Sequence, residues 1–279
     1  MQLQYLCATF AGDPKKGFLL KNPVRLDLHR LRKIARNAPS LFMGYNLYVD
    51  TDKLRLIDHV FQSARPSARS FADLGGVWKV DCAYSRYTLK KHNVKRGIVV
   101  DTDFPQKLEE KLSRDSRLRL IHGDFASPEV ASRVGQVDVI FLFDVLLHQA
   151  NPSWDVVLSM YADKTSCLVI YNQQYILGNT SVRLTSLPFE EYLALTPGGR
   201  DEVYRQVYAH GDEIHPEYKK PWRDIHNIFQ WGITDHDLRS SMNGLGFQEV
   251  FSRNYGKFSS LTAFENHAFI FIRGLPGGQ

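Results

Sequence analysis

The sequence has 279 residues, of which 43% are hydrophobic and 23% are charged, and its formal net charge is +5. This length suits one α/β domain with insertions, and the apolar fraction is large enough for a sizeable core. No apolar run reaches the roughly 18 residues of a membrane helix, and the first residues lack a signal-peptide pattern. Three scattered cysteines, Cys7, Cys82 and Cys167, predict a reduced, cytoplasmic protein, and the lack of a long apolar run predicts no membrane partner.

Short basic clusters are the main feature that could indicate a nucleic-acid partner. They are Lys15-Lys16, Arg30 to Lys33 and Lys90-Lys91. Solvated helix faces are the preferred interpretation, because the net charge is mild and the chain lacks a stacking motif, a zinc finger and a long basic tail. A small-molecule partner is therefore expected, and RNA stays open as the alternative.

The first 66 residues predict a helical extension. Apolar residues at helical spacing indicate one helix over Asp27 to Asn37 and a second over Thr51 to Gln62. Pro66-Ser67 then interrupts the pattern. We therefore divide the chain into an extension over residues 1–66 and a main domain over residues 67–279.

From Ser70 onward, short apolar runs alternate with helical patterns. Strands are expected at Phe71–Leu74, Gly97–Val100, Leu118–Ile121, Val137–Phe143 and Ser166–Tyr171. Helices are expected at Val80–His92, Pro105–Asp115, Pro128–Val134 and Pro152–Tyr161. Such alternation is typical of a parallel sheet with helices on both faces.

The end of the chain has a different pattern. A helix is expected from Ile233, with Thr234 as its N-cap, and strands at Phe247–Arg253 and Ala268–Arg273 would pair antiparallel. The fold class is therefore α/β, with a mostly parallel, seven-stranded, Rossmann-like sheet and an antiparallel terminal hairpin. Residues 173–232, rich in aromatic residues, predict a lid or substrate insert after the fifth strand.

Acidic residues follow several of the expected strands. Asp73, Asp101, Asp124 and Asp144 all fall where a strand ends, and Gly75-Gly76 follows the first strand. In an open α/β sheet, ligands bind beyond the carboxyl ends of the strands, where a carboxylate can accept hydrogen bonds from ribose hydroxyls. Two adjacent glycines allow a sharp turn and a close approach of the backbone to a ligand.

These segments resemble the class I (Rossmann-like) S-adenosylmethionine-dependent methyltransferases. The matching motifs are Phe71 to Gly76, Val99 to Asp103, His122 to Phe125, Phe143 to His148 and Leu245 to Phe247. The resemblance implies S-adenosylmethionine as cofactor, bound by Asp73, Gly75, Gly76, Trp78, Asp101, Thr102, Asp103, Asp124, Phe125 and Asp144. Trp78 stands where the family often has a small residue, so its side chain is expected to form a wall at the methionine end of the pocket.

A nicotinamide dinucleotide is the rival cofactor. It requires Gly-x-Gly-x-x-Gly, so that the pyrophosphate can approach a helix N-terminus. The segment Gly75 to Val80 has no third glycine, and Trp78 is bulky at the point of approach. A phosphate-free ligand fits better. Alternatively, Gly75-Gly76 is only a turn between a strand and a helix.

Two histidines are candidate general bases for methyl transfer. His148 lies one turn past the fourth strand, and His226 lies in the aromatic part of the insert. For both, a structural role remains an open alternative. Candidate substrate-binding residues are Asn172, Gln173, Trp222, Arg223 and Trp231. No metal is expected, because Asp144 has no second carboxylate after the fifth strand.

The preferred function is transfer of a methyl group to an oxygen or nitrogen atom of a small or medium metabolite. The first alternative is an RNA-modifying methyltransferase, whose binding of RNA would weaken steeply with salt. The second is a non-enzymatic protein that binds a partner or a nucleoside without turnover.

Overall fold

The computed structural model describes residues 49–274, with gaps at 197–200, 227 and 259–260. The chain divides into two compact units, residues 1–44 and 45–279, and all the described residues belong to the second. The expected helix Asp27–Asn37 lies outside them. The expected helix from Thr51 is confirmed as α2 (Thr51–His59), continued by a π-helical turn (Val60–Ala64). Because α2 packs in one core with the sheet, it belongs to the second unit.

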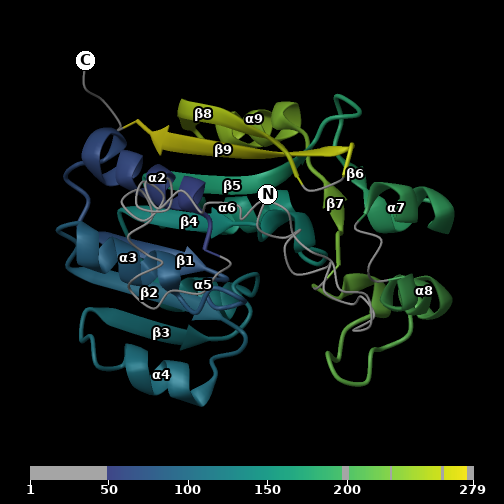
Figure 1. Cartoon of the computed structure of the whole chain (residues 1–279), viewed down its shortest axis with the longest axis horizontal. Helices are drawn as coiled ribbons and strands as arrows, with labels where there is room; N and C mark the ends of the chain where they lie inside the picture. The colour runs from purple at the N-terminus through teal and green to yellow at the C-terminus, as the bar shows by residue number, and fades with distance from the viewer. Residues whose placement is uncertain (1–48, 197–200, 227, 259–260, 275–279) are drawn as a thin grey trace, which may run out of the picture. The chain divides into compact units, whose positions relative to one another are not determined.

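The predicted seven-stranded, mostly parallel sheet is confirmed (Figure 1). Its strands lie in the order β3-β2-β1-β4-β5-β9-β8. Strands β1 to β5 are parallel, and β9 pairs antiparallel with both β5 and β8. The parallel strands are β1 (Ser70–Leu74), β2 (Arg96–Asp101), β3 (Leu118–His122), β4 (Val139–Phe143) and β5 (Cys167–Tyr175).

Helices cover both faces of the sheet because residues within each strand alternate between two cores. Phe71 and Val99 contribute to the core on one face, whereas Ala72 and Val100 contribute to the core on the other. The first face is covered by α2, α3 (Ala83–Lys91) and α4 (Gln106–Leu112). The second is covered by α5 (Pro128–Val134), α6 (Trp154–Ala162) and α9 (Asp235–Gly244). Within the described ranges, no helix has both the length and the apolar character needed to cross a membrane.

The last strands extend further than their sequences indicate. β8 (Phe247–Lys257) and β9 (Phe264–Arg273) form the expected hairpin, and β9 pairs with β5 as far as Tyr175. The expected end of β5 at Tyr171 was therefore wrong, and residues 172–174 belong to the strand rather than to the loop after it. Their polar side chains do not indicate a buried strand, but their backbone hydrogen-bonding groups pair with β9.

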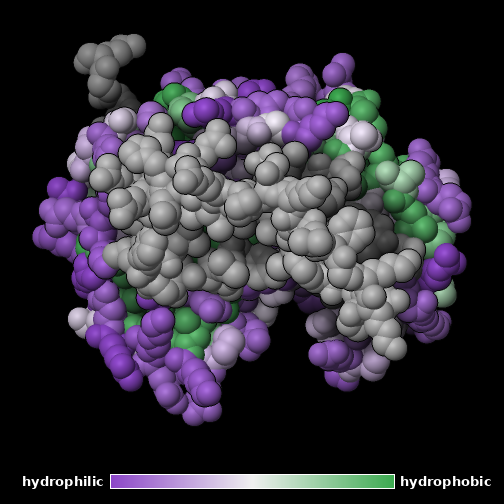
Figure 2. All heavy atoms as spheres, viewed as in Figure 1, coloured by the Kyte–Doolittle hydropathy of each residue, from purple (hydrophilic) through white to green (hydrophobic). Residues whose placement is uncertain are grey.

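The insert after β5 has helices and a core of its own. A two-stranded sheet of β6 (Val182–Arg183) and β7 (Trp231–Gly232) joins its two ends. Helices α7 (Phe189–Leu195) and α8 (Asp201–His210) lie beyond the carboxyl ends of the parallel strands (Figure 1). The surface near the start of the insert includes hydrophobic residues (Figure 2). Its buried apolar residues also contact the turn after β4, through Leu147.

Candidate functional site

The expected acids gather at one edge of the sheet. Asp73 pairs in register with Val99, and Asp101 pairs with His122. Because the strands are parallel, the segments that follow β1, β2, β3 and β4 leave the sheet on the same side. This carboxyl edge therefore combines the Gly75-Gly76 bend with several carboxylates.

Close packing explains the two glycines of the bend. Gly75 has a φ of +78°, which favours glycine, and an added Cβ would lie 2.7 Å from Cγ1 of Val145. A Cβ on Gly76 would lie 2.6 Å from a carboxylate oxygen of Asp73. Any side chain at either position would displace the acid or the turn after β4.

An irregular turn follows the bend. Three of its residues that are not glycine have positive φ: Lys79, Asp81 and Cys82. Helix α3 therefore begins at Ala83, and the expected start at Val80 was wrong. The N–H groups of this turn donate to the carbonyls of Val77 and Gly76 instead of starting a helix. As a result, no helix N-terminus directly follows the glycines.

Trp78 lies on this turn, and its side chain reaches solvent. The residue is 63% exposed, and the Lys79 ammonium lies 4.2 Å from the centre of its ring. The expected wall at the methionine end of a pocket would require the ring to turn inward from this position.

Asp101 is held against the glycine bend. Its Oδ2 accepts the N–H of Val77 at 2.9 Å, and its Oδ1 accepts the N–H groups of Thr102 at 2.8 Å and Asp103 at 3.4 Å. Burial raises the pKa of Asp101, although these backbone donors act in the opposite direction. A carboxylate has about four acceptor positions, so one remains for a further donor.

Asp73 is the most deeply buried acid of this edge. It is 1% exposed, and the hydroxyl of Ser85 donates to it at 2.6 Å. Burial raises the pKa of Asp73 to about 6, while Ser85 and the nearby Lys53 favour the charged form. The protonation state of Asp73 is thus sensitive to pH in the physiological range.

Asp124, after β3, is bound by the insert. The ammonium of Lys220 donates to its Oδ2 at 2.7 Å and also contacts Nε2 of His226, which lies 3.4 Å from the same oxygen. Burial alone would raise the pKa of Asp124, but the bonds to His226 and Lys220 outweigh it and hold that pKa well below its usual range. His226 therefore lies at the β3 end of the edge. The neighbouring Phe125 is buried, and its ring lies 3.6 Å from an ideal Cβ on Gly75.

Asp144, after β4, forms an ion pair with Lys53 of α2. Its other oxygen accepts the side-chain N–H of Gln173 at 2.7 Å. Burial alone would lower the pKa of Lys53, but Asp144 outweighs this and the net shift is upward. Lys53 was not among the residues expected to form the site. The signal was present, because Lys53, Ile57 and Val60 share one side of the helix, and a charged residue among apolar ones indicates a buried partner.

His148 lies in the turn after β4 and contacts the insert there. Its Nδ1 donates to the backbone carbonyl of Ile228 at 2.6 Å, and the ring of Phe229 lies 5.6 Å away, edge to face. Donation from Nδ1 sets the tautomer of the neutral ring, so that Nε2 carries the lone pair. This is the form that a general base needs.

The candidate substrate residues do not form one cluster. Gln173 faces Asp144, whereas the neighbouring Asn172 points to the opposite side of the sheet, where it donates to Gln174. Trp222 packs against His215, with ring centres 4.2 Å apart and the ring planes tilted. Arg223 pairs with Asp212, and Trp231 lines a shallow depression of about 270 Å³ between α6 and α9.

In the described part of the chain, no three His, Cys, Asp or Glu side chains come together in a way that could hold a metal ion. The acids of the edge instead have neighbouring cations or N–H groups as partners, as described for Asp101, Asp124 and Asp144.

Known proteins were compared with this chain and its fold. No protein-family model matches the sequence, and no curated protein matches it. Solved methyltransferase structures do match. An O-methyltransferase family protein from Burkholderia thailandensis aligns with a TM-score of 0.47 and 15% identity, over 81% of this chain and only 57% of its own length. Magnesium protoporphyrin IX methyltransferase from Synechocystis PCC 6803 aligns with a TM-score of 0.48 and 12% identity, over 94% of this chain and 90% of its own length.

A third structure matches more closely. The 1,6-didemethyltoxoflavin-N1-methyltransferase from Burkholderia thailandensis, solved with its substrate and S-adenosylhomocysteine, has a TM-score of 0.51 and 11% identity, over 93% of this chain and 94% of its own. The chain has the class I methyltransferase fold. In this methyltransferase fold, the terminal hairpin places β9 beside β5, which accounts for the extended fifth strand.

Proposed function

We propose that this protein is an S-adenosylmethionine-dependent methyltransferase that acts on an oxygen or nitrogen atom of a small or medium metabolite. The observation that carries the proposal is the contact of Asp101 with the glycine bend, at 2.9 Å from the N–H of Val77. That contact puts a carboxylate where ribose hydroxyls can donate to it, at the ligand-binding edge of the sheet. Asp73, Thr102, Asp103, Asp124, Phe125 and Asp144 would complete the cofactor site.

The geometry of the bend favours a cofactor without phosphate. A dinucleotide needs free N–H groups of a helix N-terminus behind the glycines. Here α3 begins only at Ala83, and the N–H of Val77 already donates to Asp101. The neighbouring solved methyltransferase with bound S-adenosylhomocysteine supports the same cofactor.

Calorimetric titration tests the proposal directly. The full-length protein should bind S-adenosylhomocysteine saturably, and it should give no heat with NAD at the same concentration. Absence of binding at millimolar S-adenosylhomocysteine would overturn the proposed function. Binding of NAD instead would assign the bend to a dinucleotide.

His148 is our candidate for the general base. The donor supplies an electrophilic methyl group, so the protein has to align the acceptor and remove its proton. The bond from Nδ1 to Ile228 leaves the lone pair on Nε2, and it joins the base to the insert. His226 has a different setting, because Lys220 and Asp124 engage its Nε2. We therefore propose that His226 holds the insert against Asp124.

The variant His148→Asn separates the two roles of His148. An asparagine amide can still donate to the carbonyl of Ile228, but it cannot accept a proton at neutral pH. We expect methyl transfer to slow roughly 100-fold or more, with unchanged affinity for S-adenosylhomocysteine. Transfer of a tritiated methyl group to acceptors from a metabolite extract measures the rate. Unchanged turnover in His148→Asn would show that His148 only holds the insert.

The alternative functions gain no specific support from the described residues. Of the basic clusters that could indicate RNA binding, two lie outside these residues. In the third, Lys91 lies near the hydroxyl of Tyr87, at 3.1 Å, and near Asp58. A non-enzymatic nucleoside-binding protein would retain the cofactor site, and the tritium assay distinguishes it from an enzyme.

A further inference from the structure

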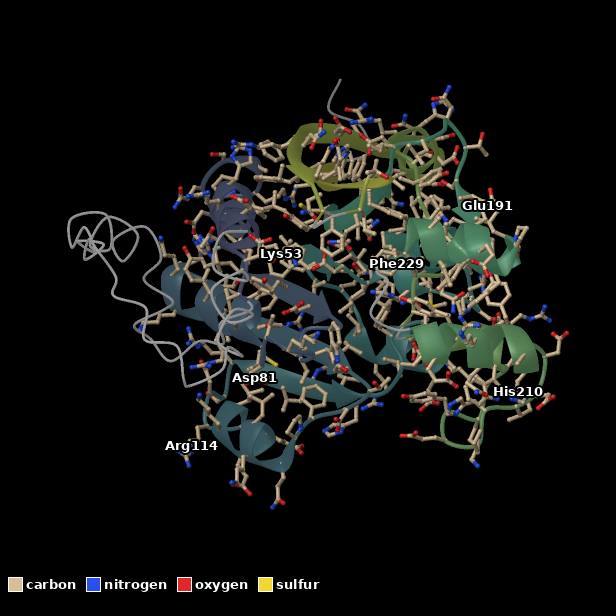
Figure 3. The ribbon with its side chains drawn as sticks, turned by 45° about the vertical axis from the view of Figure 1, so that its right-hand side comes forward. Lys53, Asp81, Arg114, Glu191, His210 and Phe229 are labelled. Carbon is tan, nitrogen blue, oxygen red and sulfur yellow. The ribbon has the colours of Figure 1, made fainter. Side chains whose placement is uncertain are left out.

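A buried lysine lies at the carboxyl edge of the sheet, on the helix that precedes the first strand. Lys53 is 6% exposed and lies on the inner side of α2 (Figure 3). Its ammonium lies 4.8 Å from the ring centre of Tyr171 and 5.6 Å from that of Tyr84. Among the described residues, Asp144 is its one hydrogen-bond acceptor. Since an ammonium has three N–H groups, two remain for a ligand or for water.

The partner of this lysine is itself oriented for binding. Asp144 directly follows β4 and has a φ of +56°, which turns its backbone sharply at the end of the strand. Gln173 donates to Oδ1 of Asp144 at 2.7 Å, and the same amide lies 3.1 Å from Oδ1 of Asn266. The carboxylate is partly exposed, with 35% of its side chain accessible. The oriented carboxylate of Asp144 and the buried ammonium of Lys53 thus lie together at this edge.

We propose that Lys53 binds the carboxylate of the amino-acid part of the methyl donor, beside Asp144. This inference rests on the proposed function, because it assumes a donor with a methionine moiety. That moiety carries one ammonium and one carboxylate, and the pair Lys53 and Asp144 offers one complementary charge for each. Charge-assisted hydrogen bonds of this kind are shorter and stronger than neutral ones.

The other charges at this edge single out Lys53. Asp73 and Asp101 are acids, and they would repel a carboxylate. Lys220 is a cation, but it is engaged by Asp124 and His226 at the β3 end. A donor that lies across the bend, with its ribose at Asp101, would reach the β4 end with its amino-acid part. Lys53 lies at that end, paired with Asp144.

Two ligands that differ in the amino-acid part test the assignment. S-adenosylhomocysteine carries the carboxylate, whereas 5′-methylthioadenosine has the same nucleoside thioether without it. We expect Lys53→Met to weaken binding of S-adenosylhomocysteine roughly 10- to 100-fold and to change binding of 5′-methylthioadenosine less than about 2-fold. Lys53→Arg, which retains the charge, should recover part of the lost affinity. Lys107→Met, an exposed lysine on α4, is the matched control and should change neither affinity.

The outcomes separate this inference from the proposed function. If the wild-type protein binds neither ligand, the proposed function fails and the assignment of Lys53 fails with it. If the wild type binds both, but Lys53→Met leaves S-adenosylhomocysteine binding unchanged or weakens both equally, only the assignment of Lys53 is overturned. An unchanged affinity is also the result expected if Lys53 binds a carboxylate of the acceptor instead.

A folding defect in Lys53→Met can be overcome by removing both charges. A single substitution leaves the partly exposed Asp144 without its cation, which costs some stability. The double variant Lys53→Met/Asp144→Asn has no unpaired charge. It should fold and show the same selective loss of S-adenosylhomocysteine binding. Binding of both ligands at wild-type affinity in the double variant would overturn the assignment.

Discussion

Replacing Asp101 with alanine is expected to weaken binding of S-adenosylhomocysteine by roughly 10- to 100-fold. A ribose hydroxyl would lose a charged acceptor, and such a bond contributes roughly 1.5–3 kcal/mol. The substitution also releases the N–H of Val77, which Asp101 accepts at 2.9 Å, so the bend itself would loosen. Calorimetric titration of the wild type and the variant measures the effect.

The control for this prediction is an acid at the opposite edge. Asp163 is exposed and lies at the end of α6, before β5 begins, so Asp163→Ala should leave the affinity unchanged. Asp101→Asn should be intermediate, since one amide oxygen can still accept a hydrogen bond. Equal affinities for wild type and Asp101→Ala would contradict the central role that we assign to Asp101.

Replacing Asp73 with asparagine is expected to raise the free energy of unfolding at neutral pH by about 3 kcal/mol. In the folded protein, burial raises the pKa of Asp73 to about 6, from an ordinary value near 4. Between these two values the folded state holds a proton that the unfolded chain has released. Wild-type stability therefore falls as pH rises through this window, and the loss persists above it. Asparagine has no charge to bury and can keep the bond to Ser85.

Urea denaturation at about pH 4 and about pH 7 tests this sign. The two proteins should have similar stability at the lower pH, and the variant should be more stable at the higher one. The same variant should bind the positively charged donor more weakly, since it lacks the carboxylate. A variant that is less stable than wild type at neutral pH would show that the ionised carboxylate of Asp73 stabilises the fold.

At the carboxyl edge of the sheet, the charge that would favour ligand binding lowers the stability of the fold. A buried carboxylate such as Asp73 costs stability, but it provides negative charge where a sulfonium cation would bind. The insert adds contacts to the same edge. Lys220 bonds to Asp124, and Ile228 accepts from His148, so the insert is bound to both the β3 and the β4 ends of the edge.

The order of strands and helices and the position of the acids could be predicted from the sequence alone. Apolar runs, helical spacing and turn residues are short-range signals, and each is contained within about ten residues. Parallel pairing then brings the segments after β1 to β4 to one edge, whatever the details of packing. For this reason Asp73, Asp101, Asp124 and Asp144 could be assigned to a common site before any contact was known.

Only the tertiary structure decided which groups those acids meet. Lys53 reaches Asp144 across 91 residues, Lys220 reaches Asp124 across 96, and His148 reaches Ile228 across 80. The extra length of β5 likewise depends on β9, a distant segment. Periodicity cannot reveal such pairs, because a polar residue in a helix or loop has the same local pattern whether it faces water or a partner. Burial decides between the two, since a charge removed from water requires a partner, and burial is a property of the folded chain.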